Sequence, residues 1–304
     1  VSFSEFLRAI GETAAAKVLD EIPLPNFAYP KLLDLFHQYA LIGGMPEIVQ
    51  QYALHRDLTR LRRVYNTLLT AYQDDVQKYA RGSLRTEVLH HCVRHIFLEA
   101  GSRITFQGFG QSNYGSREIG EALRTLEKAM LCSIVYPMTQ TQLPLLPDMK
   151  RQPYLQVLDT GLVNFFCGLQ ESLIGTKDLQ DAYRGKILQH WVGQQMLSTM
   201  NFPLDHLNFW VREKKQSNSE VDYVMPFENM LVPIEVKSGA GGKLRSLQVF
   251  MDACEHDFAI RLYAGELSLH PAVTSEGKNY RLLNLPYFLG EKIKEYLVWM
   301  KHAQ

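Results

Sequence analysis

The spacing of apolar residues changes about halfway along the chain, and this change restricts the fold more than any other feature. Up to about residue 170 the apolar side chains recur every three or four positions, as they do on one face of an α-helix. Beyond Pro203 they gather in short runs that are typical of β-strands, with one helical stretch among them. A mixed fold is therefore predicted, helical in its first half and α/β in its second.

The first hundred residues are predicted to form a helical region. Successive amphipathic patterns are separated by proline and glycine, which mark the connections between helices. Helices are expected at residues 12–19, 29–40, 58–79 and 86–99, and another is expected to begin in the segment Gly43-Gly44-Met45-Pro46-Glu47.

Residues 101–170 show the order of elements of a winged helix-turn-helix. The central helix follows Ser116, whose hydroxyl can cap the first turn. Such a module can bind DNA or pack against protein, and both roles stay open here. The predicted elements are a short middle element at 104–109, a helix at 117–129, a strand at 131–138, a wing loop at 139–148 and a returning strand at 154–158.

The second half, residues 171–304, is predicted to be a separate α/β domain. The boundary is placed near residues 171–184, where Gly175, Thr176 and Lys177 interrupt the apolar pattern. The expected order is helix, three strands, helix and strand. These elements are predicted at residues 185–200, 207–211, 221–227, 231–236, 244–253 and 258–263.

The composition is that of a folded globular protein. Hydrophobic residues make up 46% of the chain and charged residues 21%, which excludes a disordered chain. No apolar run approaches the roughly 18 residues of a membrane helix, so no membrane partner is expected. Cys92, Cys132, Cys167 and Cys254 lie far apart without a CxxC pair, which favours free thiols in a reducing, cytoplasmic environment.

The net charge restricts how the chain can bind nucleic acid. Lys plus Arg and Asp plus Glu both number 32, so any contact with DNA has to come from local basic patches. Glu118, Glu121 and Glu127 share the helix at 117–129 with basic residues, so packing against protein is an alternative role for that helix. The candidate phosphate contacts are Arg117, Arg124 and Lys128 on this helix, Lys150 and Arg151 at the wing, and Arg212, Lys214 and Lys215 before the next acidic strand.

Four charged residues occur on an otherwise apolar pair of strands. The strand-like segments are joined by a two-residue hairpin turn at 228–229. With this turn Asp222 lies opposite Glu235 and Glu220 lies opposite Lys237, with Cβ atoms about 5 Å apart. Because side chains alternate along a strand, all four are expected on one face of the hairpin.

The chemistry of these four side chains depends on how their charge is compensated. Charged groups on apolar strands are costly unless they are paired or bind a metal ion. Two adjacent carboxylates repel each other, and a divalent cation between them removes the repulsion. A neighbouring lysine can hold an attacking water or stabilise charge on a phosphate. The pattern fits metal-assisted phosphodiester hydrolysis, and it also fits a cluster of structural ion pairs.

The spacing of these residues resembles a known signature. Asp222, followed thirteen positions later by Glu235-Val236-Lys237, is similar to the D…ExK motif of the PD-(D/E)XK nuclease-like fold. The predicted order of elements is also similar to the core of that fold. The resemblance implies a restriction-endonuclease-like domain in residues 171–304, in which Asp222 and Glu235 hold Mg²⁺ or Mn²⁺ and Lys237 assists the attacking water. Glu220 is a further candidate metal ligand from the strand side.

A wider resemblance extends over nearly the whole chain. The segments at 2–7, 43–47, 74–75 and 158–162 resemble those of prokaryotic AAA-type ATPases that have a nucleotide-binding domain, a helical and winged-helix middle and a nuclease-like C-terminal domain. The resemblance implies that this chain is the part after the ATPase core, which the absence of an initiator Met also suggests. It further implies that ATP binds only in that core and that the parent protein forms a homo-oligomer.

Two departures from the family pattern bear on activity. The segment at 239–244 comes nearest to a P-loop, but Lys237 stands where the first glycine belongs and Leu244 where Ser or Thr binds Mg²⁺, so no nucleotide site is expected. Relatives often carry a Glu in the first helix of the nuclease-like domain, and Gln189 or Gln195 stands there in this chain. An amide is a weaker metal ligand than a carboxylate, which puts hydrolysis in doubt.

Three functional hypotheses follow. The chain is a metal-dependent nuclease attached to an ATPase, or it is a module of the same fold that has lost its chemistry and binds DNA or a partner protein. In the third hypothesis it is an assembly scaffold, in which the winged helix and the hairpin charges only pack.

Overall fold

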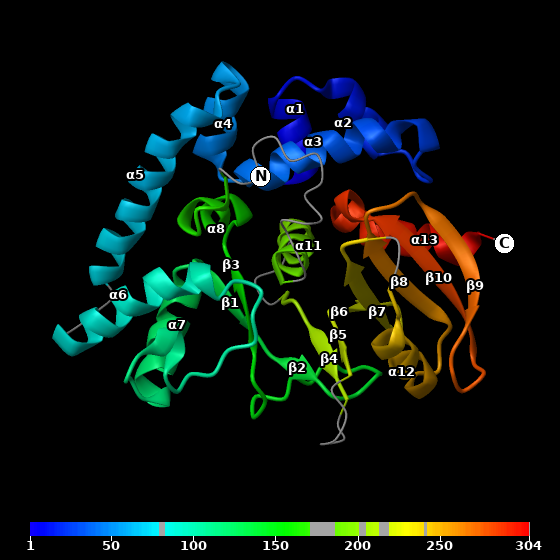
Figure 1. Ribbon diagram of the computed structural model, residues 1–304. Coiled ribbons are helices and arrows are strands. Elements are labelled where there is room, and N and C mark those ends of the chain that lie inside the picture. Colours follow the sequence, from blue (N-terminus) through cyan, green and yellow to red (C-terminus); the bar gives the residue numbers. More distant parts are fainter. Residues whose placement is uncertain (79–82, 171–185, 201–204, 213–218, 240–241, 304) are drawn as a thin grey trace.

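Helices form the first hundred residues, as predicted. The computed structural model describes residues 1–78, 83–170, 186–200, 205–212, 219–239 and 242–303 (Figure 1). Among the described helices none combines the length and the hydropathy of a membrane span. The first part comprises α1 (Phe3–Ala9), α2 (Thr13–Leu19), α3 (Tyr29–Ile42), α4 (Pro46–His55), α5 (Leu58–Gln77) and α6 (Ser83–Leu98).

Local sequence signals explain where several of these helices begin. At the start of α1, Glu5 N donates to Ser2 Oγ at 3.3 Å and Ser2 N donates to Glu5 Oε2 at 2.8 Å, which forms a capping box. Pro46 occupies the first turn of α4, where a missing N–H costs no helical hydrogen bond. The N-termini of α1 and α4 are therefore set by residues that can be recognised in the sequence.

The middle of the chain contains two helices, α7 and α8, with a small antiparallel sheet between them. Gly115, and not the predicted Ser116, is the N-cap of α7, and its N–H donates to Glu118 Oε2 at 2.8 Å. Arg103 forms an isolated antiparallel bridge with Tyr154. The elements are α7 (Ser116–Lys128), β1 (Cys132–Val135), β2 (Pro137–Met138), β3 (Tyr154–Val157) and α8 (Thr160–Phe166).

The strand that was predicted at 131–138 divides into two. β1 pairs with β3, whereas β2 runs parallel to β4 (Phe209–Val211) of the second half. Pro137 has no N–H to donate, so it cannot extend the ladder of β1. The loop that was expected to be a wing follows β2 and packs on the second half: Trp210 Nε1 donates to Thr139 O at 3.1 Å, and Thr141 Oγ1 donates to Ala253 O at 2.9 Å.

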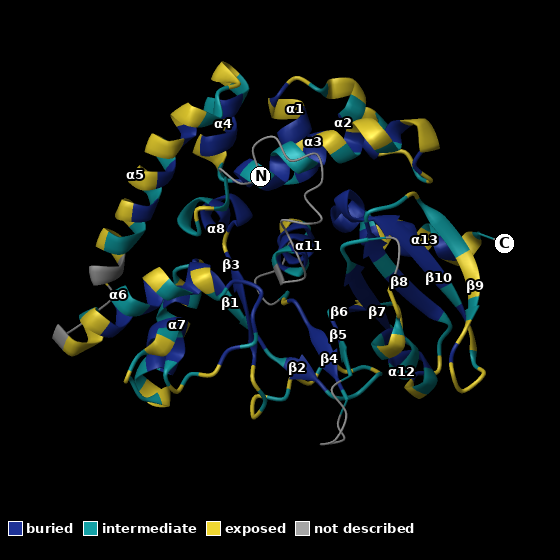
Figure 2. Ribbon diagram, in the orientation of Figure 1, coloured by how far each residue is buried: buried dark blue, intermediate teal, exposed yellow. Residues whose placement is uncertain are grey.

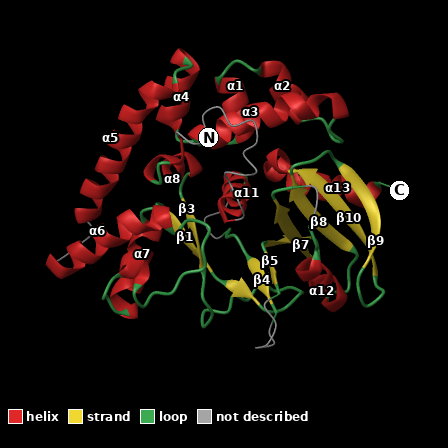
Figure 3. Cartoon of the chain, in the orientation of Figure 1, coloured by secondary structure: helices red, strands yellow, loops and turns green. Residues whose placement is uncertain are grey.

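The second half contains the predicted order of helix, strands, helix and strand. The larger sheet has the order β6-β7-β8-β10-β9, in which β7, β8 and β10 are parallel (Figure 3). α12 connects β7 to β8, which makes a βαβ unit. The elements are α11 (Lys186–Ser198), β4, β5 (Glu220–Val221), β6 (Tyr223–Phe227), β7 (Met230–Lys237), α12 (Arg245–Ala253), β8 (Phe258–Tyr263), β9 (Ser268–Val273), β10 (Asn279–Pro286), the 3₁₀ segment η3 (Tyr287–Lys292) and α13 (Ile293–His302).

Two features of this half were not predicted. β4 and β5 do not extend the larger sheet but form a separate three-stranded sheet of order β2-β4-β5. β9 also had no counterpart among the predicted elements, because it is half exposed and lacks a clear apolar run. The three predicted strands therefore belong to two sheets.

The two halves share one hydrophobic core. Phe36 of α3 stacks on Trp191 of α11 with ring centroids 4.3 Å apart. Ser4 N donates to Glu291 Oε1 at 3.1 Å, and Leu24 N donates to the Tyr296 hydroxyl at 3.0 Å. α1, α3 and α11 contribute buried residues to the same hydrophobic cluster, and buried residues are dark blue in Figure 2. The predicted domain boundary at 171–184 lies outside the described residues.

A tight junction joins the turn after α3 to the turn before α8. The buried carboxylate of Asp159 accepts from Gly44 N at 2.6 Å, from Leu162 N at 3.0 Å and from Gln194 Nε2 at 3.1 Å. A Cβ on Gly161 would lie 2.0 Å from the carbonyl oxygen of Ile42, so the backbones can meet only through glycine. These glycine- and aspartate-containing turns therefore connect the helical region, the middle of the chain and α11.

A buried histidine of α11 makes the fold sensitive to acid. His190 Nε2 accepts from Val157 N at 2.9 Å, and burial lowers the pKa of His190 to about 4. The unfolded chain takes up this proton near pH 6.5, so the contribution is complete above that pH and is lost as the pH falls toward about 4. Between pH 8 and pH 5 the wild type is expected to lose about 2 kcal/mol of unfolding free energy that the His190→Gln variant does not lose.

Urea unfolding at both pH values measures this difference. His302→Gln, at an exposed position on α13, is the control and is expected to follow the wild type. Equal losses in the wild type and His190→Gln would contradict the assignment.

Candidate functional site in the acidic cluster beside β7

The hairpin register agrees with the prediction. Phe227 pairs with Met230 and Tyr223 pairs with Ile234 across β6 and β7. Glu228 has a φ of 52° in the turn, as a two-residue hairpin loop requires. This register brings Asp222, the residue before β6, next to Glu235 of β7.

The strand does not continue through Asp222, which corrects one part of the prediction. Asp222 lies in a bend between β5 and β6, and its Oδ2 accepts from Val236 N at 2.7 Å. β5 turns away and pairs with β4, so Glu220 lies opposite Val211 and not opposite Lys237. The reason is tertiary, because Val221 and Trp210 are buried together in a second apolar cluster with α12.

Asp222 and Glu235 form the centre of the cluster. Glu235 is only 5% exposed, and its Oε1 accepts from Lys237 Nζ at 2.5 Å. Its other oxygen, Oε2, is buried and has no hydrogen-bond partner within the described part of the chain. A buried carboxylate oxygen without a donor is costly, so a cation bound at Glu235 Oε2 would stabilise it.

The two carboxyl groups are electrostatically coupled. Burial, followed by the charge of Glu235, raises the pKa of Asp222 well above its usual range. Burial also raises the pKa of Glu235, while the ammonium group of Lys237 opposes that rise. One lysine therefore does not compensate both acids, and an additional cation would stabilise their charged forms.

The pair of carboxylates fits a magnesium or manganese ion. Within the described ranges there is no group of three or more His, Cys, Asp or Glu residues that could hold a metal ion. Magnesium, however, is commonly bound by one or two carboxylates together with water and substrate phosphate. Asp222 and the unpartnered Glu235 Oε2 supply two such oxygens, so the residues present fit the ion.

Glu220, the third candidate ligand, is engaged by a basic residue. Arg103 Nη1 donates to Glu220 Oε2 at 2.7 Å. Burial raises the pKa of Glu220, and Arg103 opposes that rise. In this structure Glu220 therefore has a cationic partner of its own.

The two candidate glutamines of α11 occupy different environments. Gln189 Nε2 donates to the backbone oxygen of Asp222 at 3.4 Å, and the Tyr223 hydroxyl donates to Gln189 O at 2.7 Å. Gln195 Nε2 donates to Tyr287 O at 2.9 Å, on the side of α11 that faces η3. Of the two candidate glutamines, Gln189 is therefore the one that lies next to Asp222.

The sequence did not reveal two polar residues on the same face of the sheet. Arg261 of β8 pairs with Glu235, and Asn284 of β10 pairs with Arg261. The guanidinium group of Arg261 lies 4.3 Å from the centroid of the Tyr263 ring. The sequence signal for this residue was an arginine inside the otherwise apolar segment Phe258–Tyr263. Its pairing with Glu235 could not be predicted, because α12 separates the two strands in the sequence.

The candidate nucleic-acid contacts lie mostly apart from the acidic cluster. Arg117, Arg124 and Lys128 are exposed along α7, and Arg117 Nε forms an ion pair with Glu121 Oε1 at 3.1 Å. Lys150 is exposed, while Arg151 Nε pairs with Asp148 Oδ2 at 3.0 Å. Arg212 is half-buried beside β4, and Lys214 and Lys215 lie outside the described residues.

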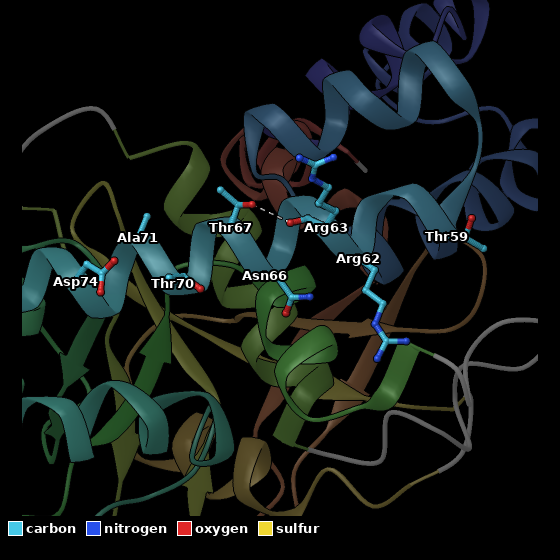
Figure 4. A pocket seen from close by; sticks show the side chains of 8 residues that line it. All are labelled: Thr59, Arg62, Arg63, Asn66, Thr67, Thr70, Ala71 and Asp74. Atoms are coloured by element: carbon cyan, nitrogen blue, oxygen red, sulfur yellow. Dashed lines mark hydrogen bonds between the residues drawn. The ribbon is translucent and has the colours of Figure 1, made fainter.

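An open groove of about 760 Å³ runs along α5. Its lining side chains are polar except for Ala71, but Figure 4 shows Arg62 and Arg63 pointing to opposite sides of the helix. Thr67 Oγ1 donates to the backbone oxygen of Arg63 at 3.0 Å, within the helix itself. Because these groups diverge, the groove offers no convergent set of catalytic side chains.

Two families of domains are similar to consecutive parts of the chain. A family described as a domain of unknown function (DUF8612) matches residues 33–173, from α3 to α8. A second family, described as a domain of unknown function (DUF4143), matches residues 184–283. No curated protein and no solved structure matches the chain. The acidic cluster of Asp222, Glu235 and Lys237 thus lies in the part of the chain that is similar to the DUF4143 family.

Proposed function

We propose that the acidic cluster catalyses metal-dependent hydrolysis of phosphodiester bonds in nucleic acid. The observation that carries this proposal is the adjacency of Asp222 and Glu235, with the buried Glu235 Oε2 left without a partner among the described residues. Two adjacent carboxylates with one lysine beside them can supply oxygen ligands to a divalent cation, which would also compensate their charge. The resemblance to the D…ExK signature agrees with this chemistry.

Each side chain of the cluster has its own role in the proposed hydrolysis. Asp222 and Glu235 would hold Mg²⁺ or Mn²⁺, which polarises a phosphoryl oxygen and lowers the pKa of a bound water. Lys237 lies on the same strand two residues beyond Glu235, and its ammonium group can donate to a water or a phosphate oxygen. Tyr223 and Gln189 hold the backbone next to Asp222 in place through the hydrogen bond between them.

The middle of the chain supports a role on DNA. α6, the bridge at Arg103, α7, β1 and β3 follow one another in the order of a winged helix-turn-helix. Because the expected wing loop packs against α12 and β4, DNA contact is assigned to the exposed face of α7. The wider resemblance adds an AAA-type ATPase core as the partner that binds ATP and forms the homo-oligomer.

A binding module without hydrolysis is the second candidate. It is favoured by Gln189, which places an amide where an acid would complete the metal site, and by the close Lys237–Glu235 ion pair. In this case the same surface would bind DNA or a partner protein under the control of the ATPase.

Incubation of the purified chain with labelled single- and double-stranded DNA and RNA separates the two candidates. Cleavage with 5 mM Mn²⁺ that stops when EDTA is added is expected if the site is hydrolytic. Binding that weakens steeply with salt, without any cleavage, supports the binding module. If the chain neither cleaves nor binds nucleic acid at low salt, the nuclease and the DNA-binding module both fail, and only binding of a partner protein is left. Anomalous density between Asp222 and Glu235 in Mn²⁺-soaked crystals is the structural check.

A further inference from the structure

Arg103 reaches the acidic cluster from a distant part of the chain. It precedes Glu220 by 117 residues, and its Nη1 lies 2.7 Å from Glu220 Oε2. The guanidinium carbon lies 4.9 Å from the centroid of the Phe209 ring of β4. The side chain is 30% exposed and the Glu220 side chain 36% exposed, so the ion pair is partly shielded from water.

The backbone of Arg103 is held firmly relative to the cluster. Arg103 bridges Tyr154 of β3, whose hydroxyl donates to the Tyr223 hydroxyl at 3.0 Å. Tyr223 in turn donates to Gln189 O, next to Asp222. The guanidinium group is therefore presented to Glu220 from a fixed position in the winged-helix-like part of the chain.

Two of the three carboxylates in the cluster have a cationic partner. Glu235 is paired with Lys237 and Glu220 with Arg103, whereas Asp222 has no ion-pair partner in the described segments. Glu220 lies two residues before Asp222, and its negative charge raises the pKa values of both Asp222 and Glu235. A third carboxylate is thus near the proposed cation site but is held by a guanidinium group, and in this structure no three acids among the described residues form a group that could hold a metal ion.

We propose that Arg103 is a positioning residue that withholds Glu220 from the divalent cation and thereby sets the affinity of the site. The inference rests on the proposed metal site of Asp222 and Glu235. Affinity for hard cations rises with the number and charge of the oxygen ligands. While Arg103 holds Glu220, a cation at the site can bind only the carboxylates of Asp222 and Glu235. Without that guanidinium group the protein offers the cation three carboxylates.

Mn²⁺ titration of the full chain, followed by electron paramagnetic resonance, measures this effect without relying on catalysis. Arg103→Gln is expected to bind Mn²⁺ about tenfold more tightly than the wild type. Arg103→Gln combined with Glu220→Gln is expected to return to within about twofold of the wild type, because the third carboxylate is gone. Arg103→Lys keeps the charge and is expected to bind as the wild type does.

Arg281 provides a matched control at the other end of the sheet. Its Nε pairs with Asp257 Oδ2 at 3.0 Å, its side chain is 33% exposed, and its guanidinium carbon lies 4.3 Å from the centroid of the Phe258 ring. Arg281→Gln therefore removes a similar ion pair and a similar ring contact. It is expected to leave Mn²⁺ affinity unchanged while lowering resistance to urea about as much as Arg103→Gln does.

The outcomes separate this inference from the proposed function. If the wild type binds Mn²⁺ and Arg103→Gln binds it equally or more weakly, the inference fails and the metal site stands. If Arg103→Gln gains affinity and the double variant keeps the gain, Glu220 is not the ligand and the inference also fails. If no variant binds Mn²⁺, the metal site and the inference fall together.

Discussion

Asp222→Asn is expected to lower the rate of Mn²⁺-dependent cleavage by about a thousandfold. The substitution removes one of two anionic ligands but keeps an oxygen that can accept from Val236 N, as Asp222 Oδ2 does at 2.7 Å. The backbone at the site is therefore preserved while the charge that holds the cation is lost. Gel-based cleavage of a labelled DNA at saturating Mn²⁺ measures the change.

The same variant is expected to be more stable than the wild type by about 1 kcal/mol at pH 7. Burial and Glu235 raise the pKa of Asp222 in the folded state, so ionisation at neutral pH opposes folding. Below the ordinary pKa of 3.8 both states are protonated and this penalty is absent. The stability advantage of Asp222→Asn should therefore grow as the pH rises from about 4, which urea unfolding at several pH values measures.

Glu255→Gln is the control for this prediction. Glu255 is an exposed acid in the loop after α12, so its substitution is expected to change neither cleavage nor stability by much. If the Asp222→Asn variant cleaves DNA at the wild-type rate, Asp222 is not part of the catalytic site. A variant that loses both activity and stability would show instead that the carboxylate is structural.

Gly161→Ala is expected to lower the free energy of unfolding by about 3 kcal/mol. The added Cβ would lie 2.0 Å from Ile42 O and 2.8 Å from Gly43 N, and both atoms belong to the backbone. Neither can move without disturbing the turn that donates Gly44 N to Asp159. Thermal and urea unfolding are expected to show the loss, because the junction ties three parts of the chain together.

Gly115→Ala tests whether this loss is specific to the close approach. A Cβ on Gly115 would meet Glu118 Oε2 at 3.5 Å, which is an ordinary contact, and the residue has a φ of −76°. Its effect is expected to stay within about 0.5 kcal/mol. Similar losses at Gly161 and Gly115 would contradict the role of the junction.

Much of the hairpin could be predicted because its determinants are local. The two-residue turn at 228–229 sets the register, and the register alone brings Asp222 beside Glu235. Helices with apolar positions at helical spacing, such as Leu58–Gln77, were predicted for the same reason. In each case the residues that decide the structure are close together in the sequence.

The partners of the acids could not be predicted, because they arrive from elsewhere in the chain. Because β5 pairs with β4, Glu220 lies opposite Val211 and not opposite Lys237. Its ion-pair partner is Arg103, which is 117 residues away in the sequence. The loop at 139–148 followed Pro137 out of the small sheet and packed against the second half. None of these contacts corresponds to a periodic pattern among neighbouring residues in the sequence.

Most of the helices and strands and the pairing of β6 with β7 follow from the amino-acid sequence, because propensity, spacing and turn chemistry act over a few residues. Only the tertiary structure decided which charges neutralise one another in the acidic cluster. That choice depends on the burial of Trp210 and Val221 under α12, on the bridge of Arg103 to Tyr154 and on the packing of α11 against the sheets. Such contacts form only when apolar surfaces from distant segments are buried together.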